Sequence, residues 1–267
     1  MAADFIDLSG RVSVVTGGAH GIGAATALEL ARAGSAVALF DLDGDEAGHT
    51  AAGIEDETGV RARGYAVDVR KAEVVKQMCD AVAEDFGSLD HLINNAGIQH
   101  VAPLPEFPDA AWDNVLAVNL DGVFYATKAA WPHMLARNRG RIINMASVHG
   151  LVASPFKPAY VAAKHAVIGL TRAAALEGAP HGITVNAVCP GAVLTDLVRA
   201  QAPYLIRTYG GDITEEQALE RAFLDAMPSK AFIDPQEVAQ LCAYLCSDAA
   251  RSITGAPLAI DGGWSAH

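Results

Sequence analysis

The sequence predicts an α/β fold, a single domain built around a parallel β-sheet of about seven strands, and three observations lead to it. Short apolar runs alternate along the chain with longer segments of helical periodicity, which is the pattern of βαβ units. A glycine-rich turn stands between the first apolar run and the first helical segment. The 267 residues are 51% hydrophobic and 19% charged, which is enough apolar material for one large core.

The predicted strands are short apolar runs that suit a sheet buried on both faces. In chain order they are residues 12–16, 37–41, 63–67, 89–94, 141–145, 184–188 and 258–260. The segments between them with clear helical periodicity are residues 24–33, 72–86, 113–136, 160–177 and 235–246. This order predicts a doubly wound sheet with helices on both faces.

Residues 192–234 interrupt the alternation with helical pieces, a Gly210-Gly211 break and Pro228, but no clear strand. A long insertion in an α/β domain is often a lid over the active site. We therefore expect a helical substrate lid at 192–234, within one domain that spans residues 1–267. A helical excursion on the surface with no role at the site is the alternative.

The glycine-rich turn predicts a dinucleotide site. Gly17, Gly21 and Gly23 open the first helix, where missing side chains let the backbone approach a pyrophosphate. The spacing departs from the common Gly-x-Gly-x-x-Gly pattern, so the turn alone is a weak signal. Asp41 ends the second strand, where a carboxylate binds both ribose hydroxyls and repels a 2′-phosphate, which favours NAD over NADP. Asp41 could instead cap the next helix, but Asp43 is available for that role.

Polar residues also end the third and fourth predicted strands. Asp68-Val69 and Asn94-Asn95-Ala96-Gly97 reach the carboxyl edge of the sheet, where ligands bind in open α/β folds. We expect them to line the adenine and ribose of the cofactor. On local chemistry alone, the Asn-Asn-Ala-Gly run could be only a strand-ending turn.

Tyr160, Lys164 and Ser147 predict acid/base chemistry. In a helix, the i,i+4 spacing places the phenol and the ammonium on one face, and the cation is expected to lower a phenol pKa that is normally about 10. Ser147 can donate its hydroxyl to the reacting oxygen. The three residues together predict a general base and an oxyanion partner in one small site.

Charge and composition exclude several classes of partner. The formal net charge of −12 repels nucleic acid and anionic lipid surfaces. No segment predicts a transmembrane helix, and residues 1–7 lack the pattern of a secretory signal, so we expect a cytoplasmic protein. The four cysteines have neither zinc-site nor disulfide spacing, and no metal is predicted.

In combination, these features resemble the short-chain dehydrogenase/reductase family over nearly the whole chain. The motifs that occur in the family's order and spacing are Thr16-Gly17-x-x-x-Gly21-x-Gly23, Asn94-Asn95-Ala96-Gly97, Asn119, Ser147, Tyr160-x-x-x-Lys164 and Pro190-Gly191. The resemblance implies a Rossmann-type fold in which Tyr160 takes the alcohol proton and Ser147 holds the reacting oxygen. It also implies that Lys164 grips the nicotinamide ribose and that Asn119 holds a water for proton relay. The expected cofactor contacts are Gly17, Gly21, Ile22, Gly23, Asp41, Asp68, Val69, Asn95, Ala96, Gly97, Tyr160, Lys164, Pro190, Gly191 and Thr195.

A narrower resemblance, to the bacterial D-3-hydroxybutyrate dehydrogenases, rests on segments with no role in cofactor binding. These segments are Ile98-Gln99-His100, residues 147–154, Lys157 and Ala162-Ala163-Lys164-His165. The resemblance implies that a substrate carboxylate is clamped by Gln99, His149, Lys157 and Gln201, next to Ser147 and Tyr160. A lysine, a histidine and two amides supply the donors that an anion needs in an acidic protein. Taken singly, each of the four could be an ordinary exposed polar residue.

Two further positions bear on the substrate pocket and the assembly. Where those dehydrogenases tend to carry a tryptophan after Pro-Gly, this chain has Ala192, which predicts a wider pocket and tolerance of longer 3-hydroxy acids. Trp264, near the carboxyl end, either packs on the substrate pocket or fills a seam between subunits. The resemblance to the wider family implies a homotetramer.

With Asp41 favouring NAD, the narrower resemblance implies NAD-dependent interconversion of (R)-3-hydroxybutyrate, or a related 3-hydroxy acid, and the 3-keto acid. The same chemistry on a neutral secondary alcohol is the alternative. A non-catalytic nucleotide-sensing regulator on the same fold is disfavoured, because a sensor has no need for the four residues of the catalytic set together.

Overall fold

The computed structural model describes residues 6–266. Most of residues 1–7, for which no secretory signal was expected, lies outside that range. Within it, seven parallel strands form one sheet in the order β3-β2-β1-β4-β5-β6-β7. The strands are β1 (Val12–Thr16), β2 (Ala36–Asp41), β3 (Ala62–Ala66), β4 (His91–Asn94), β5 (Gly140–Met145), β6 (Ile183–Pro190) and β7 (Pro257–Ile260). The prediction of an α/β fold around a parallel seven-stranded sheet is confirmed.

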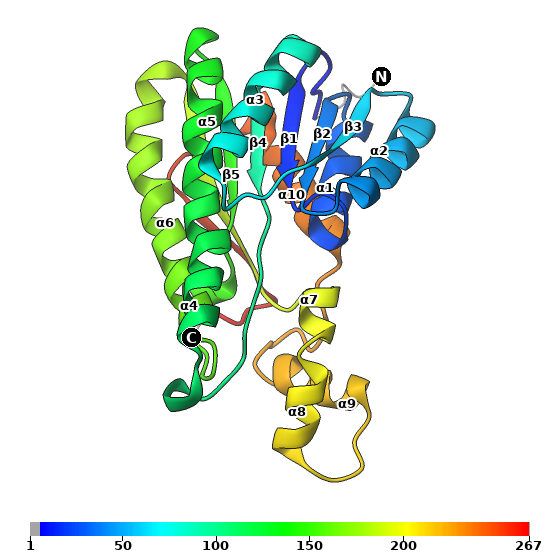
Figure 1. Cartoon of the computed structure of the whole chain (residues 1–267), viewed down its shortest axis with the longest axis vertical. Coiled ribbons are helices and arrows are strands. Elements are labelled where there is room, and N and C mark those ends of the chain that lie inside the picture. The colour runs from blue at the N-terminus through cyan, green and yellow to red at the C-terminus, as the bar shows by residue number, and fades with distance from the viewer. Residues whose placement is uncertain (1–5, 267) are drawn as a thin grey trace.

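Helices cover both faces of this sheet (Figure 1). One face packs against α1 (Gly21–Arg32), α2 (Gly44–Thr58) and α10 (Pro235–Cys246). The other packs against α3 (Ala72–Phe86), α5 (Gly122–Ala136) and α6 (Pro158–Gly178), with α4 (Asp109–Leu116) beside α6. The buried apolar residues accordingly form a separate core on each face. None of the helices within residues 6–266 is long and apolar enough to cross a bilayer.

The predicted helix at 113–136 is longer and less regular than its pattern indicates. It begins at α4, passes through a π-helical turn at Ala117–Asp121, and continues as α5 to Ala136. A π-helical turn adds one residue to a helical turn without an obvious change in composition, so the apolar spacing does not reveal it. By contrast, α3 and α10 have the predicted bounds.

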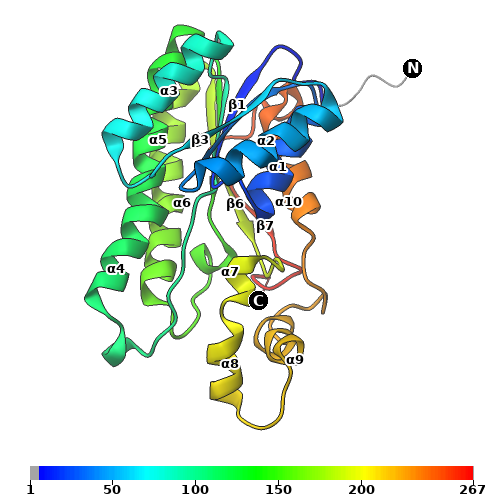
Figure 2. The same ribbon diagram turned by 45° about the vertical axis from the view of Figure 1, so that its right-hand side comes forward.

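Residues 192–234 form a helical lobe beyond the carboxyl ends of the strands (Figure 2). It contains α7 (Asp196–Arg199), α8 (Ala202–Tyr209), α9 (Glu215–Leu219) and a π-helical turn (Glu220–Leu224). An isolated parallel bridge between Val193 and Ile233 joins the two ends of the segment, where it leaves and rejoins the sheet domain. The helical character is as predicted, while the role of a lid stays a prediction.

A buried chain of side-chain hydrogen bonds ties two central strands to the helices above them. Asn94 Nδ2 donates to Asn144 Oδ1 (2.8 Å) and to Thr127 Oγ1 of α5 (3.1 Å). Asn144 Nδ2 in turn donates to Thr171 Oγ1 of α6 (2.9 Å), and that hydroxyl donates to the Val167 carbonyl (2.8 Å). Buried amides need such partners, so this chain fixes α6 against the sheet.

We predict that Thr171→Val lowers the free energy of unfolding by about 1–3 kcal/mol, because it leaves a buried amide of Asn144 without an acceptor. Thr208→Val is the matched control, since Thr208 makes the same bond to the carbonyl four residues earlier but on an exposed face. We expect it to change stability by less than about 0.5 kcal/mol. Urea unfolding of both variants measures the difference, and equal small effects would contradict the structural role of the chain.

Candidate active site

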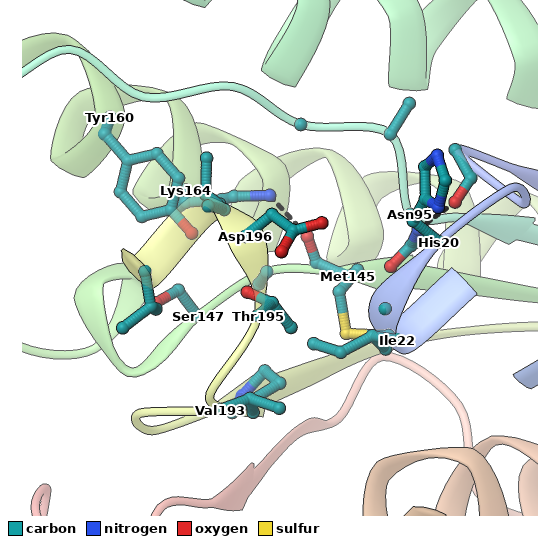
Figure 3. Close-up of a pocket in the computed structure, with 18 of the residues that line it drawn as sticks. His20, Ile22, Asn95, Met145, Ser147, Tyr160, Lys164, Val193, Thr195 and Asp196 are labelled. Atoms are coloured by element: carbon teal, nitrogen blue, oxygen red, sulfur yellow. Dashed lines mark hydrogen bonds between the residues drawn. The ribbon is translucent and has the colours of Figure 1, made fainter. Parts of the chain in front are cut away.

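A groove runs along the carboxyl ends of the strands and consists of two adjoining pockets. Residues from β5, β6 and the starts of α1, α6 and α7 line the first pocket (Figure 3). The second continues over the ends of β2 and β3. Gly17, Ala96 and Gly97 line both pockets, so the two are parts of one groove. The groove crosses the reversal of strand order between β1 and β4, where dinucleotides bind in such sheets.

The turn from β1 to α1 is tight because glycines permit it. Gly17 and Gly21 have φ values of 61° and 53°, a region that side chains disfavour. A Cβ on Gly23 would lie 1.9 Å from the carbonyl oxygen of Gly17. The side chain of His20 does not cap α1, so the first N–H groups of this helix can bind an anion in the first pocket, beside Ile22.

The Asn-Asn-Ala-Gly run after β4 supports this turn. Asn95 Nδ2 donates to the carbonyl oxygens of Thr16 (3.1 Å) and Gly17 (2.9 Å). The backbone N–H groups of Asn95 and Ala96 donate to Thr16 Oγ1 at 3.0 and 3.1 Å. The run therefore positions the glycine turn as well as lining the groove, which is more than a strand-ending turn requires.

Asp41 lies at the end of β2, in the second pocket, and helix capping falls to its neighbour. Asp43 Oδ1 accepts from the backbone N–H groups of Asp45 and Glu46, both at 3.1 Å, and so caps α2. Asp41 Oδ2 accepts from the backbone N–H of Ala19 (3.1 Å), which holds the carboxylate beside the glycine turn. The alternative in which Asp41 serves as the helix cap is therefore wrong.

The far end of the groove carries a second acid, Asp68, beside Val69. Arg70 donates to both Asp68 oxygens, at 2.8 and 2.9 Å, and to Asn114 of α4 at 2.9 Å. The hydrogen bond from Arg70 holds the pKa of Asp68 below its ordinary value. The one arginine that lines this pocket is thus already paired with a carboxylate.

The side chain of Asn119 is bonded to the backbone of a neighbouring loop. It lies in the π-helical turn, where its Oδ1 accepts from the Ile98 N–H (2.9 Å) and its Nδ2 donates to the Ile98 carbonyl (3.0 Å). This amide group pairs with the backbone of the loop after β4 and is fully buried. It therefore positions the loop that carries Gln99, and the proton-relay water stays an untested prediction.

Ser147, Tyr160 and Lys164 come together in the first pocket (Figure 3). Ser147 follows β5, and its hydroxyl accepts from the His149 N–H (3.1 Å). Tyr160 and Lys164 lie one turn apart in α6, with the ammonium 5.5 Å from the centre of the phenol ring. Lys164 Nζ donates to the Met145 carbonyl at the end of β5 (2.6 Å), which fixes the lysine between the helix and the sheet.

The expected lowering of the Tyr160 pKa is wrong for the protein's own groups. Burial raises the pKa of Tyr160, and a hydrogen bond with Ser147 offsets this only in part. Burial also lowers the pKa of Lys164 to about 8. The expectation counted the attraction between phenolate and ammonium and omitted the cost of burying both charges.

The four residues expected to clamp a carboxylate lie in two groups. Gln99 Nε2 donates to Gln201 Oε1 (3.2 Å), which joins the loop after β4 to the helical lobe. Lys157 is the residue immediately before α6, and its ammonium lies 4.9 Å from the centre of the Phe223 ring of the lobe. Burial lowers the pKa of Lys157 to about 8.

His149 connects Lys157 to the reacting end of the groove. Its ring centre is 6.3 Å from that of Tyr160 and 5.3 Å from that of Trp264, both in edge-on contact. Burial first, and then the nearby Lys157 charge, lower the pKa of His149 to about 4, so this ring is neutral at pH 7. Its Nδ1 is buried without a hydrogen-bond partner among the described residues. Trp264 thus contacts the candidate substrate residues from the carboxyl end of the chain.

Most of the residues from the end of β6 to the start of α7 line the first pocket. Pro190, Gly191 and Thr195 line it, and Thr195 would lie 3.2 Å from a Cβ on Gly21, so it faces the glycine turn. Ala192 instead belongs to the buried core, is 3% exposed and lines neither pocket of the groove. The expectation that its small side chain widens the substrate pocket stays a prediction.

Three contributors to the site were not identified from the sequence. The Met145 carbonyl holds Lys164, Arg70 pairs with Asp68, and Phe223 contacts Lys157. A backbone acceptor leaves no trace in residue type, and Phe223 lies 66 positions after Lys157. Of the three, only the role of Arg70 could have been predicted from the local sequence, since an arginine two residues after an aspartate is placed to pair with it.

Comparison with known proteins agrees with this geometry. The family model of short chain dehydrogenases matches residues 11–204. The D-beta-hydroxybutyrate dehydrogenase of Rhizobium meliloti (strain 1021) is 45% identical over 261 residues, which cover 96% of this chain and 99% of that protein. The enzyme of the same name from Cupriavidus necator (strain H16) is 43% identical over 97% of this chain and its own full length.

Solved structures agree as well. The crystal structure of gox2181 has a TM-score of 0.90 and 32% sequence identity, and the match covers 98% of each chain. The family match, the relatives and the shared fold all extend over the residues that form the groove. The chain therefore belongs to the short-chain dehydrogenase family, oxidoreductases that act on small molecules with a nicotinamide cofactor.

Proposed function

We propose that this protein is an NAD-dependent dehydrogenase that interconverts (R)-3-hydroxybutyrate, or a related 3-hydroxy acid, and the 3-keto acid. The observation that carries the proposal is the environment of Lys157. Its side chain is buried, and among residues 6–266 it has no carboxylate or hydrogen-bond partner, only the Phe223 ring. An unpaired charge on a largely buried side chain is costly, so it needs a functional reason.

The position of Lys157 at the start of α6 strengthens this argument. The amino end of a helix carries partial positive charge, which disfavours a cation there and favours an anion. A substrate carboxylate at this point would be stabilised by the ammonium and by the helix end together. The amides of Gln99 and Gln201 and the neutral ring of His149 can complete the set of donors. The neighbouring Tyr160 would then face the hydroxyl of the same small molecule.

The groove fits a dinucleotide. Its two pockets meet at Gly17, Ala96 and Gly97, so an extended ligand can reach from Asp41 to Tyr160. Asp41 favours NAD, because a carboxylate accepts from ribose hydroxyls and repels a 2′-phosphate. Arg70, the one cation lining that end, is held by Asp68 and is not free to bind the phosphate.

The chain's own residues then carry the proton chemistry, while the nicotinamide, when bound, accepts the hydride from C3. Ser147 donates its hydroxyl to the reacting oxygen, and Tyr160 removes the hydroxyl proton as general base. Lys164, held by the Met145 carbonyl, has two further N–H groups for the nicotinamide ribose and lies beside the phenolate that forms. A neutral Tyr160 at pH 7 equally suits the reverse reaction, in which it donates the proton.

We predict that Lys157→Met lowers kcat/KM for (R)-3-hydroxybutyrate about 10–100-fold. This factor corresponds to the loss of about 1.5–3 kcal/mol, which is typical of a hydrogen bond to a charged group. Lys128→Met is the control, because Lys128 also lies over a phenylalanine ring, Phe124, but on an exposed helix face. We expect that variant to keep full activity in the NADH assay. Equal activity of both variants would remove Lys157 from the proposed clamp.

The proposal also predicts that KM for the hydroxy acid rises as pH passes about 8. Burial sets the pKa of Lys157 at about 8, so its ammonium is present below that pH and is lost above it. Initial rates between pH 6.5 and 9.5 measure the dependence of KM on pH. In Lys157→Met the rise should disappear, and a rise that persists there must come from another group.

For the cofactor, we predict that Asp41→Ala lowers kcat/KM for NAD about 10–100-fold relative to NADP, through loss of ribose hydrogen bonds and of repulsion. Asp43→Ala is the control, because it removes one negative charge only two residues from Asp41. It should cost about 1 kcal/mol of stability, as a lost helix cap, and leave the cofactor ratio unchanged. A wild type that prefers NADP would contradict the role given to Asp41.

A further inference from the structure

A second hollow lies at the opposite end of the sheet from the groove. It sits at the amino ends of β5 and β6, the ends that point away from α7, α8 and α9 in Figure 1. Three segments meet there, namely the turn before β5, the turn before β6 and the chain between α10 and β7. The charged residues that line it are Arg139, Arg141, Arg251 and Asp248, and we call it the arginine hollow.

The charge of the arginine hollow is opposite to that of the protein. Three guanidinium groups face one carboxylate, whereas the chain as a whole carries a net charge of −12. A single oxygen, Asp248 Oδ1, accepts from both Arg139 and Arg141. Arg251 forms no ion pair with any residue from 6 to 266. Two positive charges of the hollow are therefore not compensated within it.

Part of this positive charge is held inside the protein. The side chain of Arg141 is 4% exposed, and its NH1 group donates to the carbonyls of Gly140 (2.8 Å) and Gly182 (3.1 Å). The Nε atoms of Arg139 and Arg141 are buried and have no hydrogen-bond partner in the described chain. Burial lowers the pKa of Arg141, and the neighbouring Arg139 lowers it further, so the two cations repel each other without full relief.

We propose that the arginine hollow is a binding site for a phosphate group, either free phosphate or the ester of a small metabolite. Guanidinium groups pair with phosphate through several parallel N–H donors, and three of them arranged around a hollow suit a group with three terminal oxygens. A phosphate carries about −1.5 to −2 charges at pH 7, which matches the uncompensated charge of the hollow. A monocarboxylate would leave one cation unpaired.

The hydroxyl groups of the hollow add to this chemistry. Thr184, Ser252 and Thr254 line the same surface, and hydroxyls are common partners of phosphate oxygens. The site is separate from the dinucleotide groove, since β5 has Arg141 near its amino end and Met145, which holds Lys164, at its carboxyl end. The proposal therefore stands independently of the substrate and cofactor assigned above.

Calorimetric titration of inorganic phosphate into the enzyme saturated with NADH tests the proposal, because the dinucleotide blocks phosphate binding at the glycine turn. Ionic strength is kept constant with chloride. We expect binding of one phosphate per chain, which Arg251→Ala weakens about fivefold, as for an exposed charged contact. Arg172→Ala removes an exposed arginine elsewhere on the surface and should leave the affinity unchanged.

Asp248→Asn gives the opposite and sharper readout. Removal of the one competing carboxylate should tighten phosphate binding about fivefold, and phosphate should restore thermal stability lost by this variant. If Asp248 served only in a structural ion pair, Asp248→Asn would lower stability without raising the affinity for phosphate. Titration with glycerol phosphate, with glycerol as the uncharged control, then distinguishes the two sources of the phosphate group. Tighter binding of glycerol phosphate than of inorganic phosphate indicates a metabolite ester, and tighter binding of inorganic phosphate indicates free phosphate.

Three results would overturn the proposal. The first is the absence of binding to the NADH-bound wild type. The second is an equal loss of affinity in Arg251→Ala and Arg172→Ala, which would show a general charge effect. The third is binding that Lys157→Met abolishes and Arg251→Ala leaves intact, which would place the phosphate in the substrate pocket instead.

Discussion

The rest of the active site is arranged around two lysines, one in α6 and one at its N-cap, whose side chains are largely buried. Neither Lys157 nor Lys164 has a carboxylate partner among the described residues, and burial lowers the pKa of each to about 8. Lys164 has one carbonyl acceptor and Lys157 has an aromatic ring. Cations without a carboxylate partner in buried surroundings lower the free energy of unfolding, so other interactions must hold α6 in place. The buried amide and hydroxyl chain from β4 through β5 to α6 supplies that support.

The parallel sheet separates opposite charges along one groove. Asp41 lies at the end of β2 and Asp68 just after β3, while Lys164 lies at the other end of the groove, bonded to the last residue of β5. A dinucleotide bound between them would meet acceptors at its adenosine ribose and donors at its nicotinamide ribose. Under the proposed function, this arrangement would let a protein with a net charge of −12 bind an acidic substrate, since the local field near α6 opposes the overall charge.

Much of this was predictable, and what was not predictable shares one cause. Apolar alternation located every strand to within two residues, and the motif spacing placed Gly17, Asp41, Ser147, Tyr160 and Lys164 along one groove. What the sequence did not reveal concerns burial and hydrogen-bond pairing. The Tyr160 pKa depends on desolvation, the Asn119 amide is paired with the Ile98 backbone, and Ala192 packs into the core. Residue type and spacing report which groups lie close together, but not which of them are already satisfied.

The most direct measurement compares NADH formation by the wild type with a series of (R)-3-hydroxy acids and with neutral secondary alcohols of the same length. The account predicts that kcat/KM for the hydroxy acids exceeds that for the matched neutral alcohols by about 10-fold or more, because only the acids meet the charge of Lys157. Faster oxidation of the neutral alcohols than of any hydroxy acid would contradict it.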